Sequence, residues 1–272
     1  MRISQRRPAP PLDQFVQALW VFEGDPRPYE KERALPDGCT LLIVNLNEDR
    51  TKIYDRHNFS LRQSFNGCAL IGPQTEYNVI DTSLTLAAGV HFKPGGAYPF
   101  LAPPVDELQG AQLPLDVLWG CFASELRERL LEAMTVDERL DILEQALLAR
   151  ARRPLSRHAA VQFALDQFRH GPHTKTIADV TDRTGLSARR FIEVFSREVG
   201  MTPKLFCRVR RFQRVLQSVA SGKPIEWTDV CLEAGYFDQA HFIHDFRAFS
   251  GINPSTYVEN RSPFPNHVPL PD

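Results

Sequence analysis

Two groups of side chains in the last third of this 272-residue chain could read the edges of nucleic-acid bases. An arginine such as Arg189 can donate two hydrogen bonds to guanine, and a glutamine such as Gln239 can pair with adenine. Histidine can donate to base acceptors, glutamate can accept from cytosine, and aliphatic side chains can contact the thymine methyl group. The candidate base-reading residues are Ala188, Arg189, Ile192, Glu193, Gln239, Ala240, His241 and His244.

These two groups occupy equivalent places in an internal repeat. In each copy a glycine, Gly185 or Gly235, follows a short helical segment, and glycine adopts the left-handed backbone of a helix end without steric cost. Ser187 or Asp238 then provides a side chain suited to capping the next helix. The repeat predicts two helix-turn-helix units. Its matching positions, 51 residues apart, are Phe191 and Phe242, Phe195 and Phe246, Gly200 and Gly251, and Pro203 and Pro254.

The elements that must position these side chains are helices. Within each second helix the phenylalanine pair is spaced i, i+4, which places both rings on one face, so we expect these rings and Tyr236 in the core. The opposite face is then free for the major groove. A helix over residues 203–220 would be about 27 Å long. That length is of the order of the about 34 Å that separates successive major grooves on one side of DNA.

The basic residues of this linking helix are candidates for contacts with DNA phosphates. They occur within eleven residues that contain no acid, although an ordinary solvated face is the alternative. Residues 1–154 carry 17 Lys and Arg against 21 Asp and Glu, whereas residues 155–260 carry 14 against 11. The candidate phosphate-contacting residues are Lys204, Arg208, Arg210, Arg211 and Arg214.

The motif over residues 234–242, together with Phe246, Gly251 and Pro254, resembles the signature of the AraC-type transcription regulators, the family of the arabinose-operon activator. This resemblance implies an all-α domain at 155–260, with two helix-turn-helix units on a long connecting helix that bind double-stranded DNA. Seven of the eight candidate base-reading residues, all except Ala188, match the family's reading positions. Ile192 and Glu193 depart from the polar or basic residues often found there. Further partners consistent with the resemblance are RNA polymerase and a second copy of the chain.

The preceding part of the chain is predicted to form a β-rich domain. Short apolar runs, broken by turns, extend over residues 20–92 and indicate strands, while residues 115–150 show helical periodicity with a capping box at Thr135 and Glu138. We therefore predict an α+β protein, in which a sandwich or barrel over residues 1–154 is closed by an αα-hairpin. It resembles, less specifically, a sensor or dimerisation module found ahead of such DNA-binding domains. The proline-rich tail, 261–272, is expected to be frayed.

Other chemistry receives little support from the sequence. The five cysteines are widely spaced without a CxxC pair, so we expect reduced, mostly buried thiols. His241 and His244 lack a third ligand nearby, and His57 and His91 lack metal-ligand spacing, so neither a metal nor a cofactor is expected. No catalytic residues stand out, and no apolar stretch is long enough for a membrane span or a signal peptide, so a cytoplasmic location is expected.

Together these features predict a sequence-specific transcription regulator rather than an enzyme. Control by a small effector bound to the N-terminal domain is expected, although the sequence identifies no effector-binding residue. One alternative is constitutive DNA binding with an N-terminal domain that only oligomerises. Another is an enzyme that carries a DNA-targeting domain.

Overall fold

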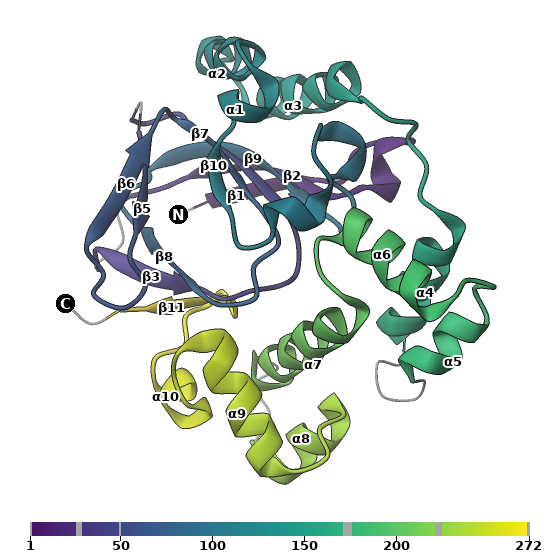
Figure 1. The fold of residues 1–272 in the computed structure, drawn as a ribbon. Helices are drawn as coiled ribbons and strands as arrows, with labels where there is room; N and C mark the ends of the chain where they lie inside the picture. The colour runs from purple at the N-terminus through teal and green to yellow at the C-terminus, as the bar shows by residue number, and fades with distance from the viewer. Residues whose placement is uncertain (1, 26–28, 49, 171–175, 221–224, 271–272) are drawn as a thin grey trace.

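The computed structural model describes residues 2–25, 29–48, 50–170, 176–220 and 225–270. Its N-terminal half is built on a six-stranded antiparallel sheet in the order β1-β2-β9-β4-β7-β10 (Figure 1). The sheet is open, with β1 and β10 at its edges, so it forms no closed barrel. Its strands are β1 (Arg2–Arg6), β2 (Val16–Glu23), β4 (Leu41–Asn45), β7 (Cys68–Ile71), β9 (Leu86–Phe92) and β10 (Gln112–Pro114).

Two smaller sheets complete the β-rich part. A three-stranded sheet has the order β11-β3-β8, and a hairpin pairs β5 with β6. The expected α+β architecture is thus confirmed, as several sheets rather than a barrel. The strands are β3 (Lys31–Ala34), β5 (Thr51–Tyr54), β6 (Leu61–Phe65), β8 (Asn78–Asp81) and β11 (His267–Pro269).

The helical hairpin covers one side of the six-stranded sheet (Figure 1). It consists of α1 (Asp116–Trp119), α2 (Phe122–Glu132) and α3 (Val136–Arg150), which pack on β2, β7 and β9. The predicted capping box is confirmed, since the Thr135 side chain accepts from the Glu138 amide and the Glu138 carboxylate accepts from the Thr135 amide. The expected single first helix is interrupted at Gly120, whose φ of 63° is left-handed.

Over its described residues, the chain between residue 154 and β11 contains helices and no strand. The helices of the two predicted helix-turn-helix units and the linking helix are present, together with α4 and α10. The Asn253 side chain caps α10 by accepting from the Thr256 amide. The helices are α4 (Ala159–His170), α5 (Ile177–Asp182), α6 (Ala188–Val199), α7 (Pro203–Ala220), α8 (Trp227–Ala234), α9 (Gln239–Ser250) and α10 (Pro254–Glu259).

The expectation of a frayed tail is wrong over residues 267–270. β11 pairs antiparallel with β3, so that Val268 lies opposite Arg33. Val268 and Leu270 are buried at 1% and 3% exposure, and the His267 ring lies 2.7 Å from the carboxylate of the buried Glu32. Burial of two apolar side chains and a complete strand ladder outweigh the cost of ordering this proline-rich segment. Residues 267–270 therefore return from the helical domain to the N-terminal domain.

Replacing Val268 with alanine is expected to lower the free energy of unfolding by about 1 to 3 kcal/mol, because a buried side chain loses two methyl groups. Urea unfolding of the whole chain would measure this. Val117→Ala is the matched control, since Val117 is 67% exposed and should change the unfolding free energy by less than about 0.5 kcal/mol. Equal, small effects at both positions would contradict the packed tail.

The N-terminal domain also contacts the helix-turn-helix region elsewhere, for example at Gly200 and at Leu35. The left-handed Gly200, which ends α6, lies so close to Pro73 and Val105 that an added Cβ would come within 2.6 Å and 2.8 Å of their side chains. Leu35, just after β3, belongs to the same apolar cluster as the helices of the C-terminal domain. The N-terminal domain thereby supports the end of α6 that lies away from its candidate reading residues.

Candidate nucleic-acid interface

The first helix-turn-helix unit is α5, a turn and α6. The turn contains Gly185 with a φ of 71°, and the Ser187 side chain accepts a hydrogen bond from the Arg190 amide at the start of α6. Phe191 and Phe195 are both completely buried, as the repeat predicts. The capping and the apolar pair together fix which face of α6 is turned outward.

All four candidate reading residues of α6 are exposed. Ala188 and Arg189 lie in its first turn, and Ile192 is 43% exposed on the same helix. The Glu193 carboxylate lies 2.9 Å from the Arg190 guanidinium, and both side chains are more than half exposed. Exposed pairs of this kind contribute little stability, so Arg190 does not immobilise Glu193.

The second unit, α8 and α9, has the same local construction. Gly235 has a φ of 85°, and the Asp238 carboxylate accepts from the His241 amide at 2.7 Å. Phe242 and Phe246 are buried, which confirms the core assignment. The exposed candidates on α9 are Gln239, Ala240 and His244.

His241 is less available than its three neighbours. Its ring packs edge-on against Tyr236, with centroids 5.3 Å apart. Its Nε2 lies 3.7 Å from the Asp245 carboxylate, and the side chain is 38% exposed. His241 therefore lies at the border between the exposed face of α9 and the core, where Tyr236 is buried as expected.

An ion pair between Arg208 and Asp245 joins the linking helix α7 to the second recognition helix. The Arg208 Nη2 and Nε atoms donate to Asp245 Oδ1 at 2.7 Å and 3.2 Å, and the guanidinium lies over the Phe249 ring. Asp245 is only 1% exposed. The hydrogen bond to the carboxylate raises the pKa of Arg208. Arg208 thus holds α9 in place. Its ion pair with Asp245 competes with the predicted phosphate contact.

The other arginines of α7 also face protein groups. Arg211 lies over the Tyr236 ring and donates to the Gly235 carbonyl, which supports the turn of the second unit. Arg214 donates to the carbonyl of Arg169. Arg210 is half-buried and lies near enough to the Cys39 thiol to lower its pKa, against the larger rise caused by burial and by Asp37.

Lys204 is the exposed member of the predicted phosphate-contacting group. The four arginines of this predicted basic face are half-buried. Arginines that the sequence interpretation left out, including Arg190 and Arg247, are instead exposed on the two recognition helices. The phenylalanine spacing predicts which face of α6 and of α9 is exposed. This spacing could have identified Arg190 and Arg247 from the sequence.

Residues 180–260 match a protein family described as a helix-turn-helix domain. The C-terminal domain is a helix-turn-helix domain of the AraC type. Residues 4–114 match a second family, described as a domain of unknown function (DUF6597). Transcription regulation and DNA binding are the functions that the AraC-type match supports. No curated protein matches the sequence significantly.

Among solved structures, the chain is similar to ToxT from Vibrio cholerae. One ToxT crystal form is 10% identical, with 95% of this chain and 98% of that chain covered and a TM-score of 0.47. ToxT bound to (E)-4-(8-methylnaphthalen-1-yl)but-3-enoic acid is 11% identical, with 95% and 99% covered and a TM-score of 0.48. Unsaturated fatty acid bound ToxT is 12% identical, with 88% and 93% covered and a TM-score of 0.44.

A cavity of about 440 Å³ lies in the N-terminal domain. The β5–β6 hairpin, β8 and residues 110–113 line it, and its polar groups include Arg56, His57 and Arg62. Its size is within the range of small-molecule sites. Across the described ranges of the chain, no helix is long and apolar enough to cross a membrane.

The cysteines lie as expected for reduced thiols. Cys39, Cys68, Cys207 and Cys231 are buried and Cys121 is exposed, all without a disulfide partner. Burial raises the pKa of the Cys207 thiol to about 11. A thiol of this kind remains protonated at neutral pH and packs as a small apolar group.

Proposed function

We propose that this protein is a sequence-specific regulator of transcription, in which α6 and α9 each read one segment of the same DNA duplex. The observation that supports this most strongly is the repeated construction of the two helices. Each is capped by a side chain, anchored by a buried phenylalanine pair and exposed on the opposite face. Helices exposed in this way are what helix-turn-helix proteins place in the major groove.

We assign base reading to Ala188, Arg189, Ile192 and Glu193 in one groove and to Gln239, Ala240, His241 and His244 in the other. Arg189 is suited to guanine and Gln239 to adenine, and these two side chains should carry most of the discrimination. His241 would contribute least, because Tyr236 and Asp245 already engage its ring. Lys204 would contact phosphate, while Arg208, Arg210, Arg211 and Arg214 mainly position the two units.

Regulation would act through the N-terminal domain, which contacts α6 at Gly200 and pairs with the tail as β11. A ligand that favours one arrangement of these contacts would change DNA affinity, because it shifts the populations of the two arrangements. The cavity beside the β5–β6 hairpin is one place for such a small molecule. These contacts favour control by an effector, rather than the alternative in which the N-terminal domain only oligomerises.

Selection of bound duplexes from a random DNA library would test the proposal. The full-length chain should be used, because β11 is part of the N-terminal sheet. We expect enrichment of a bipartite motif with halves about one helical turn, or about 10 base pairs, apart. Salt-sensitive binding without any enriched sequence would contradict sequence-specific recognition.

Replacing Lys204 with alanine is expected to weaken binding to selected and random duplexes alike and to reduce the slope of log affinity against log salt by about 1. Titrations at several salt concentrations would measure the slope. Arg2→Ala is the control, since Arg2 is exposed on β1, outside the helix-turn-helix domain. An unchanged slope in Lys204→Ala would show that this lysine does not meet phosphate.

A further inference from the structure

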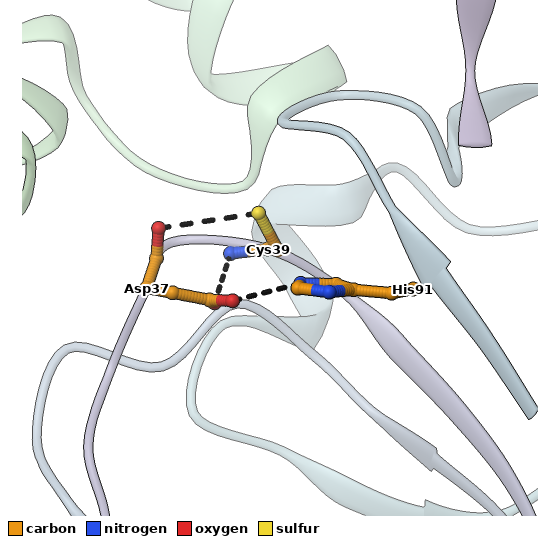
Figure 2. Close-up of side chains that lie close together, drawn as sticks. All are labelled: Asp37, Cys39 and His91. Atoms are coloured by element: carbon orange, nitrogen blue, oxygen red, sulfur yellow. Dashed lines mark hydrogen bonds and ion pairs between the residues drawn. The ribbon is translucent and has the colours of Figure 1, made fainter. Parts of the chain in front are cut away.

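Three side chains of different chemistry meet where the N-terminal domain contacts α7. Figure 2 shows Asp37, Cys39 and His91, whose carboxylate, thiol and imidazole atoms all lie within 4.8 Å of one another. Asp37 Oδ2 is 2.8 Å from His91 Nε2. Among the described residues this is the group of His, Cys, Asp and Glu side chains that could hold a metal ion.

The local fold explains how residues far apart in the sequence form this cluster. Residues 36–39 make a tight turn, in which Gly38 has a φ of 78° and the Cys39 amide donates to Asp37 Oδ1 at 2.8 Å. The chain then enters β4, whose first residue, Leu41, lies opposite His91 in the ladder with β9. The sequence interval of 52 residues between Cys39 and His91 conceals this contact, because only the pairing of β4 with β9 closes it.

We propose that Asp37, Cys39 and His91 bind one divalent transition-metal ion of the Zn²⁺ class. Thiolate, imidazole and carboxylate are the ligands that such ions prefer, and solvent would complete a tetrahedron. Tetrahedral bonds of about 2.0 to 2.3 Å place ligand atoms about 3.3 to 3.8 Å apart. The present separations, 2.8 Å between Asp37 and His91 and at most 4.8 Å within the cluster, lie on either side of this range. One thiolate and one carboxylate also balance the charge of a divalent ion in this half-buried place.

The site is joined directly to the helix that links the two reading units. Gln213 of α7 donates to the Pro36 carbonyl at 2.8 Å. A Cβ added at Gly38 would lie 3.5 Å from Val209 and 3.7 Å from Met201, so the turn packs against α7 and against the connection between α6 and α7. An ion bound by Asp37 and Cys39 would fix this turn. If the proposed DNA-binding function holds, occupancy of the site would therefore alter DNA affinity.

Titration of the chelator-treated, full-length protein with Co²⁺, followed by competition with Zn²⁺, would test the metal site. We expect one Co²⁺ per chain, tetrahedral visible bands and a thiolate-to-cobalt charge-transfer band that Zn²⁺ removes. Cys39→Ser should abolish the charge-transfer band. Asp37→Asn and His91→Gln should weaken binding by at least the about 10- to 100-fold loss known for outer-shell partners of metals.

Cys121→Ser is the matched control, because Cys121 is the exposed cysteine and the one most open to adventitious metal. Its spectrum should equal that of the parent protein. No stoichiometric Co²⁺ binding, or a charge-transfer band that survives in Cys39→Ser and disappears in Cys121→Ser, would overturn the proposal. Circular dichroism shows whether each variant is folded. If Cys39→Ser is unfolded, the loss of Co²⁺ affinity in His91→Gln tests the metal site instead.

The effect of the metal on DNA binding can be measured separately. With a selected duplex, Zn²⁺ is expected to change the dissociation constant by about fivefold or more in the parent protein and not in His91→Gln. An unchanged dissociation constant in a protein that binds Co²⁺ as described would overturn the coupling to α7. Absence of DNA binding under all conditions would refute the proposed function, while the cobalt spectrum would still decide the metal site.

Discussion

Replacing Arg208 with alanine is expected to lower the free energy of unfolding by about 2 to 4 kcal/mol. The substitution leaves Asp245, which is 1% exposed, as a buried carboxylate without its bidentate partner. Removal of one member of a fully buried pair costs about 3 to 5 kcal/mol. We expect somewhat less here, because the Arg208 side chain is 31% exposed and solvent screens part of the attraction. Urea unfolding of the full-length chain measures the loss.

Arg190→Ala is the control for Arg208→Ala. Arg190 also pairs with an acid, Glu193, but both side chains are more than half exposed, so we expect a change below about 1 kcal/mol. In an Asp245→Asn background the loss caused by Arg208→Ala should shrink, because the two residues act as a unit. A stable Arg208→Ala variant with a reduced salt slope for DNA would instead support a phosphate contact.

Gln239→Ala is expected to weaken binding to the selected duplex by about 1 to 3 kcal/mol, or about 5- to 150-fold, with little effect on random DNA. The amide of Gln239 lies exposed in the first turn of α9, where it can pair with adenine through two hydrogen bonds. Competition titrations with selected and random duplexes would measure both affinities.

Gln217→Ala provides a matched control for Gln239→Ala. Gln217 is an exposed glutamine on α7, outside both recognition helices, and its replacement should leave both affinities unchanged. Equal losses on selected and random DNA in Gln239→Ala would mean that Gln239 does not read a base.

Local signals in the sequence were sufficient for most of the helices. A helix start depends on a capping side chain a few residues away, so Ser187, Asp238 and the capping box at Thr135 could be recognised from the sequence. The i, i+4 phenylalanine pairs likewise determined which face of α6 and α9 is buried. These interactions join residues that are close in the sequence, so a local sequence pattern is enough to predict them.

Long-range contacts account for what the sequence did not reveal. The pairing of β11 with β3 joins residues more than 230 positions apart, and no local pattern distinguishes such a strand from a frayed tail. The partner of Arg208 lies 37 residues further along the chain, so the acid-free run did not reveal this ion pair. The contact between Asp37 and His91 depends in the same way on the pairing of β4 with β9.

The most direct test of two-unit recognition is a repeat of the duplex selection with Arg189→Ala and with Gln239→Ala. Each variant removes one side chain from one exposed recognition helix and leaves the caps and the buried phenylalanine pairs unchanged. We expect Arg189→Ala to lose sequence preference in one half of the motif and Gln239→Ala to lose it in the other half. Loss in the same half for both variants, or in neither, would contradict the assignment of α6 and α9 to separate segments of one duplex.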